Sequence, residues 1–160
     1  MENKRMRESW PFILPLPAKP AEQYEVLASV FKSDIALSVL KEIRVNGKTY
    51  QKDILRRLSD HSNKSVLKYL RRFVEAGILE EGMDRIGVEG RAVWVKWYKP
   101  TFMGKWFIVL LKPREEFSPS EISRMLQELI AYYAKSISRI CLNYGLKPER
   151  FKEIFDKYLR

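Results

Sequence analysis

Apolar residues recur every three or four positions through the first half of the chain, which is the spacing of helices that bury one face. This spacing predicts helices at residues 22–31, 34–45, 50–58 and 63–76. Ser33, Thr49 and Ser62 stand at the positions of N-caps, and Gly77 is a typical stop after the last helix. The first helix carries on one side Tyr24, Leu27 and Phe31. The predicted buried stripe of the last helix consists of Val66, Leu70, Phe73 and Val74.

A different pattern follows Gly77 and predicts a β-hairpin. Residues 78–81 form a short strand-like stretch, and residues 91–98 are rich in aromatic and β-branched side chains. Between them, residues 82–90 contain three glycines and predict a nine-residue loop at the tip of the hairpin. Pro100 ends the second strand, and Thr101 is placed to cap a short apolar helix that reaches about residue 111.

The C-terminal part of the chain predicts one long helix and one short helix. Ser118-Pro119-Ser120-Glu121 is a capping box with proline at the first helical position, and the helix continues to about Tyr144, where Gly145 ends it. Residues 148–159 form the last predicted helix. The long helix has an apolar seam with nearly coiled-coil spacing, formed by Ile122, Leu126, Leu129, Tyr133, Ile137, Ile140 and Tyr144.

These elements divide the chain into three regions. Residues 1–22 contain four prolines and predict an extended arm, because proline removes backbone donors and disfavours helix. Residues 23–112 predict a mainly α domain with a small β-hairpin, which places the fold in the α+β class. Residues 113–160 form a helical extension.

The composition excludes several classes of protein. The chain has 160 residues, 46% of them hydrophobic, so it can build a packed core, but its apolar runs are too short to span a bilayer. We therefore expect a cytoplasmic protein. Cys141 and His61 are the only residues of their types, which excludes an internal disulfide and the usual Cys/His zinc sites. Nothing in the sequence suggests catalysis, so we expect no enzyme, no metal and no cofactor.

The net charge of +10 predicts a polyanionic partner, most often nucleic acid. Most of the excess lies in residues 33–112, which carry 16 Lys and Arg against 9 Asp and Glu. Asn and Gln together number 7 against 50 charged residues, a balance that suggests a thermophilic source.

The predicted helix at residues 63–76 is the clearest candidate for nucleic-acid binding. Outside its buried stripe it presents four cations and no acid between residues 63 and 72. The candidate residues are Asn63, Lys64, Ser65, Lys68, Tyr69, Arg71 and Arg72. A helix fits the major groove of DNA, where Arg, Lys and Asn can read base edges, so we expect residues 63–69 to face bases and Arg71 or Arg72 to reach phosphate. The alternative is an ordinary solvated helix face.

The order of these elements resembles the winged helix-turn-helix fold. The segments that carry the resemblance are Thr49 with Asp53-Ile54 and Leu58, Ser62 with Lys64-Ser65-Val66 and Leu70, Glu75-Ala76-Gly77-Ile78-Leu79, and Arg91 to Tyr98 followed by Pro100-Thr101 and Gly104. Within this fold the chain is most similar to archaeal and bacterial regulators of the ArsR and MarR type. The resemblance implies a homodimer that reads a palindromic or pseudo-palindromic operator. Metal-sensing members use clustered Cys and His, which this chain lacks.

Further contacts are expected on either side of this helix. Arg85 and Arg91 of the wing can enter a minor groove, although Asp84 and Glu89 weaken that prediction. Gln51 and Lys52 begin a helix, where a phosphate contact and a solvated first turn are equally supported. Base stacking is conceivable for Trp94, Trp97 and Tyr98, but packing of one strand face on the core is favoured.

The seam of the long helix favours pairing with the same helix of a second chain over folding back onto its own domain. Cys141, between Ile140 and Leu142, is expected to be a small buried hydrophobic residue.

Together these patterns predict a homodimeric, sequence-specific transcriptional regulator that binds double-stranded DNA. Helix 63–76 would occupy the major groove, with the wing at 82–91 assisting. Two alternatives stay open: a winged-helix protein-interaction module of a transcription or replication assembly, and a non-specific architectural chromatin protein. No residue pattern indicates a small-molecule effector.

Overall fold

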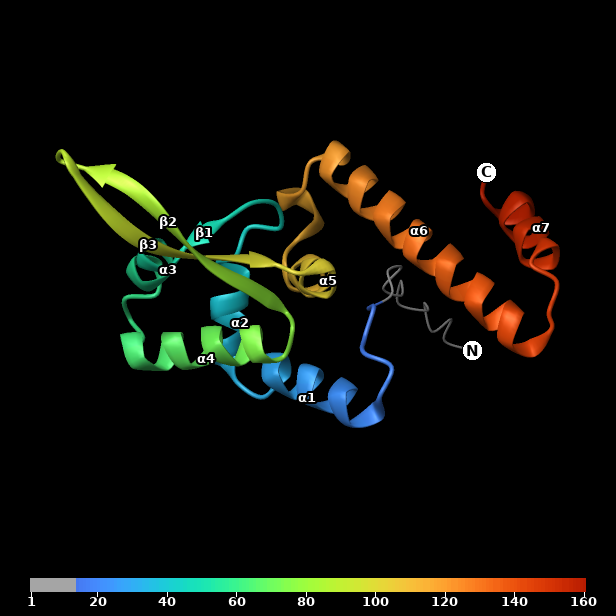
Figure 1. Cartoon of the computed structure of the whole chain (residues 1–160), viewed down its shortest axis with the longest axis horizontal. Helices are drawn as coiled ribbons and strands as arrows, with labels where there is room; N and C mark the ends of the chain where they lie inside the picture. Colours follow the sequence, from blue (N-terminus) through green and yellow to red (C-terminus); the bar gives the residue numbers. More distant parts are fainter. Residues whose placement is uncertain (1–13) are drawn as a thin grey trace, which may run out of the picture. The chain divides into compact units, whose positions relative to one another are not determined.

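The computed structural model describes residues 14–160, and the chain separates into two compact units (Figure 1). The N-terminal unit ends at Pro113, and the C-terminal unit is Arg114–Arg160. In the described residues, the N-terminal unit combines helices with a three-stranded antiparallel sheet, whereas the C-terminal unit is helical. This architecture confirms the predicted α+β class.

The N-terminal unit alternates helices and strands in an order close to the predicted one. Its elements are α1 (Pro20–Phe31), α2 (Asp34–Lys41), β1 (Thr49–Tyr50), α3 (Gln51–Arg57), α4 (Asn63–Glu75), β2 (Leu79–Val88), β3 (Arg91–Pro100) and α5 (Phe102–Leu111). Three predicted N-caps are confirmed, because the side chains of Ser33, Ser62 and Thr101 accept hydrogen bonds from backbone N–H groups in the first turns of α2, α4 and α5.

The core of the N-terminal unit lies between the helices and one face of the sheet. The predicted stripe of α4 is buried at Val66, Leu70 and Phe73, while Val74 is half-buried. The sheet contributes Leu79 and Tyr98 to the core, and α5 contributes Trp106, Phe107, Ile108 and Val109. The buried stripe therefore sets the orientation of α4, and the side chains on its opposite side are exposed to solvent.

The apolar side predicted for α1 is not its buried side. Val26 and Val30 are buried, whereas Tyr24 and Phe31 are exposed, and the Phe31 ring meets the Phe107 ring at 6.2 Å between centroids. The small valines allow α1 to lie close to α2 and α4, and the large rings stay at the rim of the core.

The loop predicted at residues 82–90 is wrong, because β2 and β3 pair along their whole length. The ladder runs from Leu79 opposite Pro100 to Val88 opposite Arg91, and only Glu89 and Gly90 form the turn. Both turn residues have positive φ, 49° and 75°, as in the two-residue turns that match the twist of a hairpin. Gly82 lies in the ladder opposite Trp97, whose ring occupies the space that a Cβ would need. Gly82 is therefore required by cross-strand packing and Gly90 by a tight turn, and neither belongs to a long loop.

Thr49 is not the N-cap of α3. Thr49 and Tyr50 pair with Tyr98 and Trp97 as β1, so the strand order in the sheet is β1-β3-β2. The buried Thr49 hydroxyl accepts a hydrogen bond from the Arg44 backbone N–H at 3.0 Å. Helix α3 begins at Gln51 without a side-chain cap.

The C-terminal unit contains a short 3-10 turn, η1 (Arg114–Glu116), and two helices, α6 (Pro119–Tyr144) and α7 (Glu149–Tyr158). Both hydrogen bonds of the predicted capping box are present: the Glu121 N–H donates to Ser118 Oγ, and the Ser118 N–H donates to Glu121 Oε2 at 2.8 Å. Gly145 ends α6 in the left-handed conformation, as predicted. Of the helices described in residues 14–160, none combines the length and apolar character that crossing a membrane requires.

Candidate nucleic-acid interface

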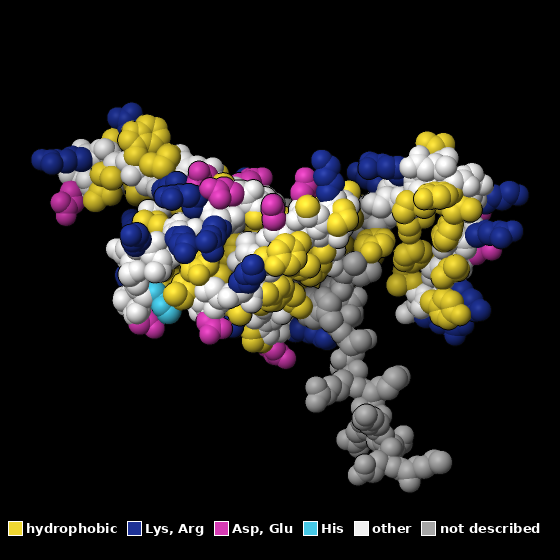
Figure 2. Space-filling view, turned by 90° about the horizontal axis from the view of Figure 1, so that it is seen from below, with side chains coloured by type: hydrophobic (Ala, Val, Ile, Leu, Met, Phe, Trp, Pro, Cys, Tyr) yellow, Lys and Arg dark blue, Asp and Glu magenta, His cyan; other side chains and the backbone are white. Residues whose placement is uncertain are grey.

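Helix α4 presents its predicted binding residues on the side opposite its buried stripe. The exposed members are Asn63, Lys64, Lys68, Arg71 and Arg72. Ser65 and Tyr69 are half-buried, and Ser65 is tied to the N-cap because the Ser62 hydroxyl donates to its Oγ at 2.9 Å. Figure 2 is seen from the side on which α4 lies in Figure 1, and it shows Lys and Arg side chains gathered there near the one histidine.

The cations of α4 form no ion pairs within the described part of the chain, whereas several cations of the neighbouring elements do. Four of those cations are bound to carboxylates: Lys48 to Asp84, Arg57 to Glu42, Lys96 to Glu81 and Lys99 to Glu80. By contrast, no carboxylate among residues 14–160 lies within 4.0 Å of the charged groups of Lys64, Lys68, Arg71 and Arg72. The positive charge of this helix face is therefore available to an external anion.

The Tyr69 ring lies between two of these cations. Lys68 Nζ is 5.9 Å and Arg72 Cζ is 5.5 Å from its centroid, within the range of cation–π attraction. Tyr69 thus lies within the cationic face of α4.

Gln51 and Lys52, predicted to contact phosphate, differ in availability. Gln51 is half-buried, and its Oε1 accepts a hydrogen bond from the Tyr98 hydroxyl at 2.8 Å. Burial, assisted by the charge of Glu81, raises the pKa of Tyr98 to about 12, so the phenol remains a donor near neutral pH. Lys52 is exposed. Only Lys52 therefore keeps the freedom to reach a phosphate.

Arg85 and Arg91 lie on the hairpin at different distances from its turn. Arg91 starts β3 next to the turn, and Arg85 stands in β2 opposite Trp94. Both side chains are exposed, and neither has a carboxylate within 4.0 Å among the described residues. Their placement is compatible with the predicted minor-groove contact.

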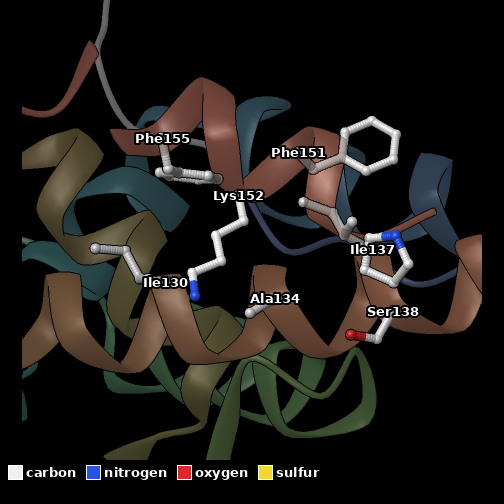
Figure 3. Close-up of a pocket in the computed structure, with 8 residues that line it drawn as sticks. Ile130, Ala134, Ile137, Ser138, Phe151, Lys152 and Phe155 are labelled. Carbon is white, nitrogen blue, oxygen red and sulfur yellow. The ribbon is translucent and has the colours of Figure 1, made fainter. Parts of the chain in front are cut away.

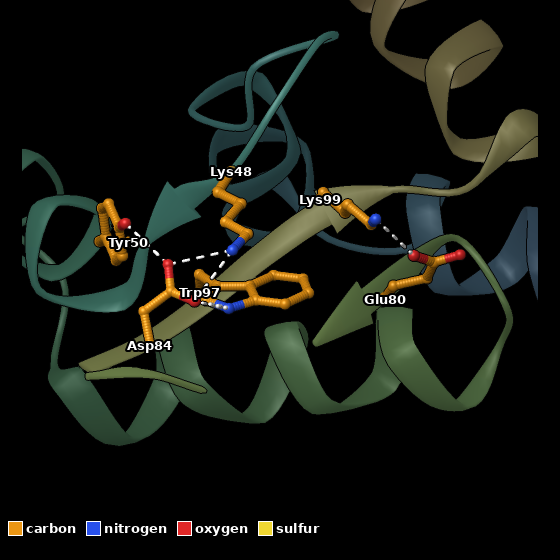
Figure 4. Close-up of polar contacts among 6 residues, drawn as sticks. All are labelled: Lys48, Tyr50, Glu80, Asp84, Trp97 and Lys99. Atoms are coloured by element: carbon orange, nitrogen blue, oxygen red, sulfur yellow. Dashed lines mark hydrogen bonds and ion pairs between the residues drawn. The ribbon is translucent and has the colours of Figure 1, made fainter. Parts of the chain in front are cut away.

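Asp84 anchors the lower part of the hairpin to β1 (Figure 4). Its carboxylate accepts hydrogen bonds from Lys48 Nζ at 2.9 and 3.0 Å, from the Tyr50 hydroxyl at 2.9 Å and from Trp97 Nε1 at 3.1 Å. The bond from Lys48, with those from Tyr50 and Trp97, lowers the pKa of Asp84, and the bond to Asp84 raises the pKa of Tyr50. The negative charge of Asp84 is thus compensated within the domain.

The role of Lys48 was not predicted. Lys48 and Tyr50 flank Thr49 at a spacing of two, which in a strand places both side chains on the face opposite the buried threonine. Recognising residues 49–50 as a strand would have brought Lys48 and Tyr50 together, but a two-residue strand carries almost no local signal.

The apolar seam predicted on α6 is only partly covered. Leu129 is buried, Ile122, Leu126, Tyr133 and Ile137 are half-buried, and Ile140 and Tyr144 are exposed. Cys141 is buried, as predicted. Exposed apolar side chains continue on α7 and at the C-terminus, namely Ile154, Phe155, Tyr158 and Leu159.

Helices α6 and α7 enclose an apolar groove of about 240 Å³ (Figure 3). The side chain of Lys152 reaches from α7 towards α6. The other residues that line the groove are Ile130, Ala134, Ile137, Ser138, Pro148, Phe151 and Phe155. This two-helix unit therefore leaves much of its apolar surface in contact with water.

In residues 14–160, no group of three His, Cys, Asp or Glu side chains is arranged to hold a metal ion. Comparison of the chain with models of known families, with curated proteins and with solved structures gives no match.

Proposed function

We propose that this chain is a winged helix-turn-helix transcriptional regulator that binds double-stranded DNA sequence-specifically as a homodimer. The element order supports the fold assignment: after α1, the three helices α2, α3 and α4 and the short strand β1 precede a long hairpin that completes a three-stranded sheet. In this assignment α3 and α4 form the helix-turn-helix, α4 is the recognition helix, and β2 and β3 form the wing.

The observation that carries the proposal is the unpaired cationic face of α4. Four cations lie on one exposed face of α4 and none of them has a carboxylate within 4.0 Å among the described residues, whereas Lys96 and Lys99 of β3 are each paired with a glutamate of β2. A duplex carries about one negative charge per 1.7 Å of axis, so such a face gains affinity by releasing condensed counterions. Asn63 and Lys64 at the N-terminal end of α4 are suited to base edges, where each good contact contributes about 1–3 kcal/mol of discrimination.

The test compares two double variants that lose the same charge. Lys68→Ala with Arg72→Ala removes two cations of α4, and Lys135→Ala with Arg139→Ala removes two exposed cations of α6. Binding to a labelled duplex is measured by fluorescence anisotropy at low salt, and circular dichroism confirms that both variants fold. We expect the α4 variant to bind at least about tenfold more weakly and the α6 variant to bind nearly as the parent does.

Two results would contradict the proposal. Equal losses in both variants would indicate attraction by net charge alone, and no binding of the unmodified chain would favour the protein-interaction alternative. Selection of bound sequences from a random pool separates a regulator from an architectural protein, because a regulator binds its site about 10³- to 10⁷-fold more tightly than unrelated DNA.

A further inference from the structure

The three aromatic residues of β3 have different environments. Tyr98 is buried and bonded to Gln51, and Trp97 donates to Asp84, so both serve the fold. Trp94, in contrast, has 63% of its surface exposed. Met83 is exposed on the same face of the hairpin as Trp94, whereas the exposed Val88 and Val93 lie on the other face.

The hairpin register shows which way Trp94 faces. Directly opposite residues share a face, and faces alternate along each strand. Arg85 and Trp94 stand opposite one another and therefore lie on the same face of the sheet as Leu79 and Tyr98. Nearer the base of the hairpin, helices cover this face. Val93 lies on the other face. In Figure 2, seen from the α4 side, hydrophobic side chains and cations stand together on the projecting hairpin.

The outer half of the hairpin is a stiff projection of defined length. Asp84 fixes its base, the ladder is complete, and a two-residue turn closes it. From Asp84 to Val88, four residue steps, a strand rises roughly 13 Å. Trp94, opposite Arg85, lies one residue beyond the Asp84 position, so it stands near the anchored base of this projection and not at its tip.

We propose that Trp94 is an apolar wedge that enters the minor groove of a duplex held by α4 and bends it. This inference rests on the proposed DNA binding. Arg85, opposite Trp94, suits the negative potential of that groove, and the indole suits the sugar walls and an opened base step. Unstacking a base step costs free energy, which contacts of the bent duplex with the wing and α4 offset.

The test compares Trp94→Ala with Val93→Ala, an adjacent residue on the opposite face that is 41% exposed. Duplex affinity is measured by anisotropy and bending by energy transfer between dyes at the two duplex ends. We expect Trp94→Ala to weaken binding by between about fivefold and a hundredfold and to lower the energy transfer. Val93→Ala should change neither quantity, and Trp94→Phe should keep part of both.

The inference is overturned if Trp94→Ala behaves like Val93→Ala, or if the unmodified chain leaves the duplex straight. A loss confined to single-stranded DNA overturns it as well, in favour of base stacking on free strands. In each of these cases the unmodified chain still binds the duplex through α4, so the proposed function stands. If the chain binds no duplex at all, the proposed function itself fails.

Discussion

At the scale of single residues, Asp84 has the largest structural consequence for the candidate interface. Three donors from two segments converge on its carboxylate: Lys48 and Tyr50, on either side of β1 residue Thr49, and Trp97 of β3. The cluster fixes the base of the hairpin and compensates a charge that would otherwise repel a phosphate backbone.

The stabilisation by Asp84 should depend on pH. Because the folded-state pKa of Asp84 is lowered, its contribution is complete above the unfolded-state value of about 3.9 and is lost as the pH falls through the folded-state pKa. The melting temperatures of the parent and of Asp84→Asn should therefore differ at neutral pH and converge towards about pH 2.

Glu80→Gln is the control for this pH dependence, because Glu80 and Lys99 form an exposed pair at 3.4 Å that should contribute little. A constant difference in melting temperature between the parent and Asp84→Asn across the pH range would contradict the assigned role.

The turn residue Glu89 is the one described residue other than glycine with a positive φ. Asn adopts this conformation more readily than Glu, so Glu89→Asn should stabilise the protein by up to about 1 kcal/mol in thermal denaturation. Removing a negative charge at the tip should also tighten DNA binding slightly. Glu89→Gln removes the charge but keeps the backbone strain, so it should tighten binding without the gain in stability.

Predictions for single residues were correct where the hydrogen-bond partner lies within a few positions in the sequence. Ser33, Ser62, Thr101 and Ser118 cap helices through N–H groups two or three positions away, so the sequence spacing is sufficient. Thr49 failed because its hydroxyl binds Arg44 and its backbone pairs with a strand almost fifty residues later. The structure at such positions depends on residues distant in the sequence, and a local sequence pattern carries no information about those residues.

At the scale of elements, α4 and the hairpin contribute differently to the proposed recognition. The helix was predictable in extent and orientation because its apolar spacing and caps lie within one segment. The hairpin was recognised, but its tip was predicted as a long loop because glycines usually mark irregular backbone. Only the pairing of Gly82 with Trp97 explains why a glycine stands inside a strand here.

The two ends of α4 should show different mutational signatures. Arg71→Ala should weaken binding to all duplexes alike and reduce the slope of log affinity against log salt by about 0.9, as expected for one phosphate contact. Asn63→Ala should instead change which bases are preferred and leave the salt slope unchanged. Sequence selection and salt titration on the same two variants measure both effects. Indistinguishable signatures would contradict the proposed orientation of the helix.

At the scale of the whole molecule, the C-terminal unit exposes an unusual amount of apolar surface. A unit of two helices cannot build a large core, and α7 has only ten residues, a length at which an isolated helix is marginal. The exposed aromatic and aliphatic side chains of α6 and α7 are therefore suited to packing against a second copy, as the predicted homodimer requires.

Introducing a charged residue into the exposed apolar surface of α7 should prevent dimerisation. Ile154 is 55% exposed on α7, so Ile154→Asp should leave the fold intact but make the protein monomeric at about 10 µM in analytical ultracentrifugation. Glu153→Ala, on a neighbouring exposed position, should remain dimeric. A monomeric parent, or a dimeric Ile154→Asp variant, would assign the apolar surface to another partner.

The full pairing of β2 and β3 makes the hairpin an arm of fixed length instead of a flexible loop. A flexible loop could adjust to any spacing between grooves, but a laddered arm fixed at its base spans one distance only. In the proposed function α4 fits the major groove of B-form DNA, whereas the deep, narrow major groove of A-form RNA would exclude it. The proposed contact would thus be restricted to one type of double helix, against which the hairpin can reach only at a fixed distance.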